Sequence, residues 1–133
     1  MKKSYDTLIN DVVQLHEDGK AESRRSGNHA QTRAYWDIGR RIHKYELGEN
    51  GRATYGEGLI EKLSEDLTKK YGAGFSKRSL NYMIMLSREY PREKLKTGLS
   101  WSKYTLLMSV NESALRRKLE QETIKEEGIR YSV

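Results

Sequence analysis

The sequence predicts an all-α fold: a compact bundle of about five to six helices forming a single domain over residues 1–133. First, apolar residues recur at three- and four-residue intervals along several segments, as in amphipathic helices. Second, Leu, Lys, Glu and Arg are abundant, whereas Val is scarce and there is one Pro, which favours helix over sheet. Third, the chain of 133 residues is 35% hydrophobic, which is enough for one core.

The first two predicted helices span residues 4–18 and 29–47. The apolar stripe of the first consists of Tyr5, Leu8, Ile9, Val12 and Leu15. We expect Gly19 to end this helix, and the polar stretch KAESRRSGNHAQ after it to be a loop or the frayed start of the second helix. Along the second helix, Trp36, Gly39 and His43 share a strip beside the main apolar face. A glycine there predicts that another helix packs closely against it.

Two further helices are predicted over residues 56–70 and 77–89, separated by the turn Gly72-Ala73-Gly74. Phe75 and Ser76 follow the turn, and Ser76 is a preferred N-cap residue. Pro91 limits the extent of the fourth helix. We expect a short fifth helix over residues 102–110 and a sixth that is capped by Asn111 and ended by Gly128.

The segment KKYGAGFSKRSLNYMIML resembles a helix-turn-helix, in which the second helix presents its N-terminal residues to DNA. Residues 69–90 hold five Lys/Arg and one Asp/Glu, so positive charge is concentrated there. The predicted phosphate contacts are Lys69, Lys70, Lys77 and Arg88. The predicted base-facing residues are Arg78, Asn81 and Tyr82, because Arg and Asn are side chains that read guanine and adenine edges.

A protein-binding role is the alternative. Glycine turns followed by a capped helix also occur in helical proteins that do not touch DNA, and Glu89 is unhelpful for a polyanionic partner. Tyr82, Met85 and Trp36 could instead form an apolar patch for self-association or for docking a nuclease or restriction-type subunit.

The sequence contains no pattern that indicates catalysis, a metal or a cofactor. There are no cysteines, and we interpret the three histidines, His16, His29 and His43, as isolated surface residues. No apolar run reaches the length of a membrane span, and the N-terminus does not read as a signal peptide. We therefore expect a non-enzymatic, soluble, cytoplasmic protein.

Four ordered motifs resemble the N-terminal domain of the YhcG-type proteins, which are predicted bacterial nucleases of the PD-(D/E)XK superfamily. The motifs are YWDIGRRI (35–42), ATYGEGLIEKLSEDLTKKYGAGFSKRSLNYM (53–83), YP (90–91) and LSWSKYTLLMSV (99–110). The resemblance covers about residues 5–128. It implies a helical accessory domain without catalytic residues, with the nuclease fold in a separate C-terminal domain. It therefore implies DNA binding or assembly with a partner in a DNA-processing or defence setting.

The sequence departs from this family in two places. Lys103 stands where a histidine is common, and the segment EEGIRYSV occupies the place of a Trp-Ser-Val-Arg-like motif. We therefore expect either a stand-alone chain or a fragment of a longer nuclease.

Overall fold

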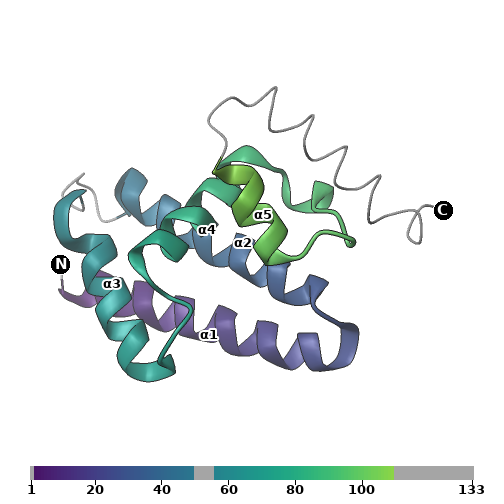
Figure 1. Ribbon diagram of the computed structural model, residues 1–133. Helices are drawn as coiled ribbons and strands as arrows, with labels where there is room; N and C mark the ends of the chain where they lie inside the picture. Colours follow the sequence, from purple (N-terminus) through teal and green to yellow (C-terminus); the bar gives the residue numbers. More distant parts are fainter. Residues whose placement is uncertain (1, 50–55, 110–133) are drawn as a thin grey trace.

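The computed structural model describes residues 2–49 and 56–109, and within these ranges the chain is helical with no strand (Figure 1). The long helices are α1 (Lys2–Ser26), α2 (His29–Lys44), α3 (Gly56–Tyr71) and α4 (Lys77–Glu89), followed by the short α5 (Trp101–Met108). A π-helical turn, η1 (Tyr45–Glu49), extends α2, and a 3₁₀ turn, η2 (Arg92–Lys94), follows α4. The all-α prediction is confirmed. The predicted sixth helix, residues 111–128, lies outside the described residues.

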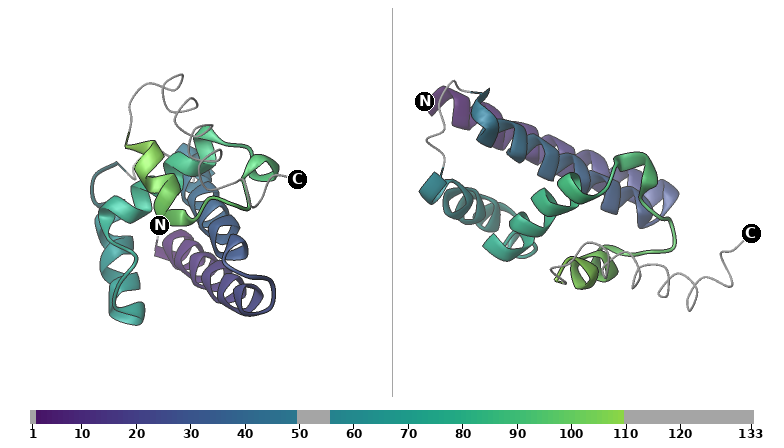
Figure 2. Two further views of the ribbon diagram at one scale, coloured as in Figure 1. Left: turned by 45° about the vertical axis from the view of Figure 1, so that its right-hand side comes forward. Right: turned by 90° about the horizontal axis from the view of Figure 1, so that it is seen from above.

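The helices form two layers, one of which is the antiparallel pair α1 and α2. Figure 1 shows α2 running back along α1, and the view from above in Figure 2 shows α3, α4 and α5 on one side of this pair. Among the described elements α4 packs against α2, and α3 and α5 each pack against α4. α4 is therefore placed between the two-helix layer and α5.

α1 continues for eight residues beyond its predicted end at residue 18, because Gly19 does not end the helix. Gly19 is buried where α1 meets α2, and a Cβ atom on it would lie 2.4 Å from the Cβ of Ala34. The glycine is needed for this close approach. The helix ends instead at Gly27, which has a φ of +97° and donates its N–H to the carbonyl of Ser23 at 2.9 Å. The prediction that Gly19 ends the helix was wrong.

The predicted close packing at Gly39 is confirmed. A Cβ atom added to Gly39 would lie 1.9 Å from the carbonyl oxygen of Met83, so α4 crosses α2 with backbone against backbone at this point. A side chain of any size at residue 39 would push the two helices apart.

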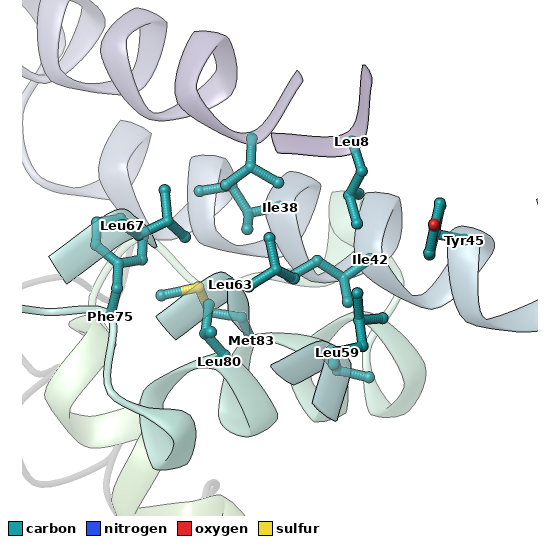
Figure 3. Packing of buried hydrophobic residues seen from close by; sticks show 12 residues of the cluster. Leu8, Ile38, Ile42, Tyr45, Leu59, Leu63, Leu67, Phe75, Leu80 and Met83 are labelled. Carbon is teal, nitrogen blue, oxygen red and sulfur yellow. The ribbon is translucent and has the colours of Figure 1, made fainter. Parts of the chain in front are cut away.

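Two clusters of buried apolar residues hold the fold together, and α4 contributes to both. The larger cluster joins α1 to α4 and includes Leu8, Ile38, Ile42, Leu63 and Leu80, which Figure 3 shows converging between the helices. The smaller cluster contains Leu86, Tyr90, Leu95, Leu99, Tyr104, Leu107 and Met108, with Tyr82 and Met85 packed on its edge. α5 and the segment before it therefore cover one flank of α4.

The turn between α3 and α4 has the predicted local structure. Gly72 and Gly74 have φ values of +88° and +98°, which only glycine adopts readily. Phe75 is buried in the larger cluster, and the Ser76 hydroxyl accepts a hydrogen bond from the backbone N–H of Ser79 at 3.1 Å. These two residues fix the start of α4 and expose its first turn.

Candidate nucleic-acid interface

α4 has one buried and one exposed face, and the exposed face carries most of the predicted DNA-contacting residues. Leu80, Met83, Ile84 and Ser87 are buried, as the helical pattern predicts. Lys77, Arg78, Asn81 and Arg88 are exposed. Lys77, Asn81 and Arg88 fall within a narrow strip at helical spacing, with Arg78 beside it. Four predicted side chains of α4 can therefore reach a partner in solution.

Tyr82 differs from the expectation that it faces solvent. It is half-buried, and like Met85 it packs against the smaller cluster, on the side of α4 that α5 covers. Its hydroxyl accepts a hydrogen bond from the Arg78 guanidinium at 3.3 Å, and the guanidinium lies 5.5 Å from the centre of the tyrosine ring. Tyr82 therefore orders Arg78 along the helix surface.

Lys77 is paired with a carboxylate on the neighbouring helix. Its Nζ lies 3.0 Å from an oxygen of Glu61 on α3, and the two side chains are 58% and 62% exposed. Exposed ion pairs of this kind contribute between about zero and 1 kcal/mol. A phosphate can therefore compete with Glu61 for Lys77 at small cost.

The remaining predicted cations lie in two places, beside the turn between α3 and α4 and at the far end of α4. Lys69 and Lys70 are exposed in the last turn of α3, directly before the glycine turn. Arg88 lies about 16 Å along the helix from Lys77 at a rise of about 1.5 Å per residue. Burial raises the pKa of Glu46 on η1. The nearby positive charge of Arg88 partly opposes this rise. Arg88 is thus separate from the basic surface that the other residues form around the turn.

The turn between α3 and α4 packs against a buried histidine. His16 is only 8% exposed, and its ring meets the rings of Tyr71 and Phe75 edge-on, with centroids 4.5 and 4.9 Å away. Burial lowers the pKa of His16, and nearby Lys20 lowers it further. The interpretation of His16 as a surface residue was wrong. His29 and His43 are half-buried rather than exposed.

Sequence reasoning missed a groove between α4 and α5. It has a volume of about 520 Å³, and its lining includes Arg78, Ser79 and Tyr82 of α4 and Trp101, Ser102 and Leu106 of α5. Leu106 is 66% exposed, which is unusual for a large apolar side chain in this protein. Leu106, within the motif LSWSKYTLLMSV, is the residue that could have indicated this groove. The position of Leu106 beside α4, however, depends on tertiary packing.

The described residues hold neither a candidate metal site nor a candidate membrane span. No group of three or more His, Cys, Asp or Glu side chains in residues 2–49 and 56–109 is arranged to hold a metal ion. No helix in the same part of the chain combines the length and the apolar character that crossing a membrane requires.

Comparison with known proteins assigns the chain to a family. The model of the family described as DUF1016 N-terminal domain matches residues 11–131. The Escherichia coli (strain K12) protein named "Putative nuclease YhcG" is 30% identical over 154 residues, an alignment that covers 91% of this chain and 41% of that protein. The chain therefore spans less than half the length of this relative. No solved structure matches the chain. Since the family model covers nearly all of its residues, the chain belongs to the DUF1016 N-terminal domain family, and its resemblance to the N-terminal domain of the YhcG-type proteins is confirmed.

Proposed function

We propose that this chain is a non-catalytic DNA-binding domain that delivers a nuclease or a related DNA-processing activity to its substrate. The observation that carries the proposal is the exposed basic surface around the turn between α3 and α4. Lys69, Lys70 and Arg78 are exposed there, and none of them forms an ion pair within residues 2–49 and 56–109. The name of the relative, "Putative nuclease YhcG", supports a setting in which DNA is the partner. The proposal places the domain in the cytoplasm.

The position of Arg78 and Lys77 favours an anionic ligand. Both lie in the first turn of α4, where cations oppose the helix dipole by a few tenths of a kcal/mol. In this proposal a phosphate at this end offsets that cost, because it can bind the first-turn N–H groups that Ser76 does not cap, together with Lys77 and Arg78 once these leave Glu61 and Tyr82. The adjacent Asn81 is exposed one turn further along, and in this proposal it contacts a base edge.

Fluorescence anisotropy with labelled duplex DNA tests the proposal. Binding of wild type, Arg78→Glu and the control Arg24→Glu is measured between about 50 and about 200 mM salt. Arg24 is an exposed cation in the last turn of α1, so the control makes the same charge change away from α4. We expect Arg78→Glu to weaken binding and to reduce the slope of log K against log salt by about one unit. Equal, salt-insensitive binding by all three proteins contradicts the proposal.

In this proposal the chain does not cleave DNA by itself. An assay with supercoiled plasmid and Mg²⁺ or Mn²⁺ checks this part. Metal-dependent nicking that co-purifies with the folded chain, and that persists in independent preparations, would contradict it.

A protein-binding function is the second candidate, and two exposed leucines favour it. Leu47 and Leu106 are 73% and 66% exposed, on η1 and α5 respectively. A partner that covers such a side chain gains binding free energy, because fully burying a leucine is favourable by about 1.5–3 kcal/mol. Sedimentation of the purified chain tests self-association, and a clean monomer at high protein concentration would count against it. Co-sedimentation with a nuclease or restriction-type subunit tests the other form of this function.

A further inference from the structure

The groove between α4 and α5 opens beside the proposed DNA-contacting turn. Arg78 and Tyr82 form part of its α4 wall, and the opposite wall comes from the short helix α5. We propose that this groove binds unpaired nucleotides of a DNA strand, next to the duplex that α4 contacts. This inference rests on the proposed function and adds the form of DNA that the domain prefers.

The charge of the groove suits a DNA strand. Among residues 56–109 no acidic side chain lines it, and Arg78 contributes a positive charge. Its volume of about 520 Å³ lies within the range of about 300–1,000 Å³ that is typical of small-molecule sites. A phosphate group therefore meets a cation and no carboxylate among the described lining residues.

The hydroxyl groups of the groove supply both donors and acceptors. Ser79 accepts a hydrogen bond from the Ser76 hydroxyl at 3.2 Å, so its own O–H remains available to a phosphate or sugar oxygen. Thr105 donates to the carbonyl of Ser102 at 2.8 Å, so its oxygen remains available to accept a base N–H. The side chain of Ser102 has no hydrogen-bond partner within the described residues and can do either.

The apolar part of the groove distinguishes unpaired bases from a duplex. Tyr82 carries the Arg78 guanidinium on its ring, and Leu106 extends into solvent from the opposite wall. A duplex presents phosphates and base edges to such a surface, because its base faces are stacked on one another. An unpaired base exposes its faces, which can stack on the Arg78 guanidinium that lies over the Tyr82 ring, and stacking of bases on protein side chains is worth about 1–3 kcal/mol per base. Unpaired nucleotides are therefore the ligand that can contact both the polar and the apolar side chains of the groove.

The test compares two labelled DNAs by fluorescence anisotropy: a blunt duplex and the same duplex with a short single-stranded overhang. We expect wild type to bind the overhang DNA at least about fivefold more tightly than the blunt duplex. This factor corresponds to about 1 kcal/mol, the lower limit for stacking one base. Ser102→Glu places a carboxylate in the groove at the second position of α5, where a negative charge favours the helix. We expect it to abolish the preference for the overhang, and Leu106→Glu to do the same.

Thr97→Glu is the matched control, because Thr97 is exposed, precedes α5 and does not line the groove. It should lower the affinity for both DNAs by a similar small factor and keep the preference. Equal wild-type affinity for the two DNAs overturns this inference and leaves the proposed function standing. A preference that survives in both Ser102→Glu and Leu106→Glu also overturns it. Absence of binding to either DNA overturns the proposed function and the inference together.

A protein ligand in the groove gives a different result. If Leu106→Glu abolishes self-association in sedimentation while the affinities for both DNAs stay unchanged, the groove is a protein contact and the inference is wrong.

Discussion

Replacing Gly39 by alanine tests the packing that positions α4. The added Cβ would lie 1.9 Å from the carbonyl oxygen of Met83 and 2.8 Å from the backbone nitrogen of Ile84, whereas ordinary contacts are 3.4–4 Å. The two backbones would have to separate locally by at least about 1.5 Å. Overpacking of a core costs about 1–3 kcal/mol or more, and alanine recovers up to about 1 kcal/mol of helix propensity. We expect the free energy of unfolding to fall by about 2 kcal/mol.

Urea denaturation followed by circular dichroism measures this change, and a thermal scan should show a Tm lower by about 6–10 °C. Gly19 supplies a matched comparison, because its added Cβ would meet a side chain, the Cβ of Ala34 at 2.4 Å. Gly19→Ala should therefore be partly rescued by Ala34→Gly in a double-mutant cycle. Gly39→Ala has no such rescue, since its obstacle is backbone. If Gly39→Ala leaves stability unchanged or raises it, the backbone-to-backbone crossing described above is wrong.

Three further predictions concern the turn and the start of α4. Glu61→Gln frees Lys77 from its ion pair, so we expect DNA affinity to rise by about two- to fivefold in the anisotropy assay, in keeping with about 0.5–1 kcal/mol for an exposed pair; weaker binding would contradict this. Ser76→Ala removes the hydrogen bond to the Ser79 N–H and should cost about 1 kcal/mol of stability in urea, whereas Ser76→Asp, which keeps an acceptor, should cost less. Burial lowers the pKa of His16 in the folded state below its unfolded value near 6.5. The unfolded state then binds more protons, so stability should fall as the pH drops from about 7 through the folded pKa, and His16→Gln should reduce this slope in denaturation at several pH values. An identical slope in the variant would exclude His16 as the cause.

Features set by local sequence could be predicted. The limits of α4, the capping role of Ser76 and the buried strip of α4 follow from residues close together in the chain. The close helix packing at Gly39 could be predicted, because a glycine beside an aromatic residue on a second strip of a helix indicates a close contact with another helix. The family resemblance was carried by ordered motifs and covered almost the whole chain.

Features set by packing could not be predicted in the same way. Gly19 has the appearance of a helix end, and only the contact with Ala34 shows that it lies inside a longer helix. The half-burial of Tyr82 depends on where α5 lies, which helical periodicity does not specify. His16 did carry a signal, since it follows Leu8 and Val12 at four-residue spacing on the buried stripe, but the residue type favoured a surface position.

The membership of α4 in both apolar clusters has a consequence for the energetics of the domain. Side chains from one helix of thirteen residues complete two cores that otherwise share little, so neither core can open without exposing the apolar surface of the other. The described helices should therefore unfold in a single transition, with the amide protons of α4 the last to exchange with solvent. A ligand that grips the exposed side of this helix would then raise the melting temperature of the entire domain rather than that of one segment.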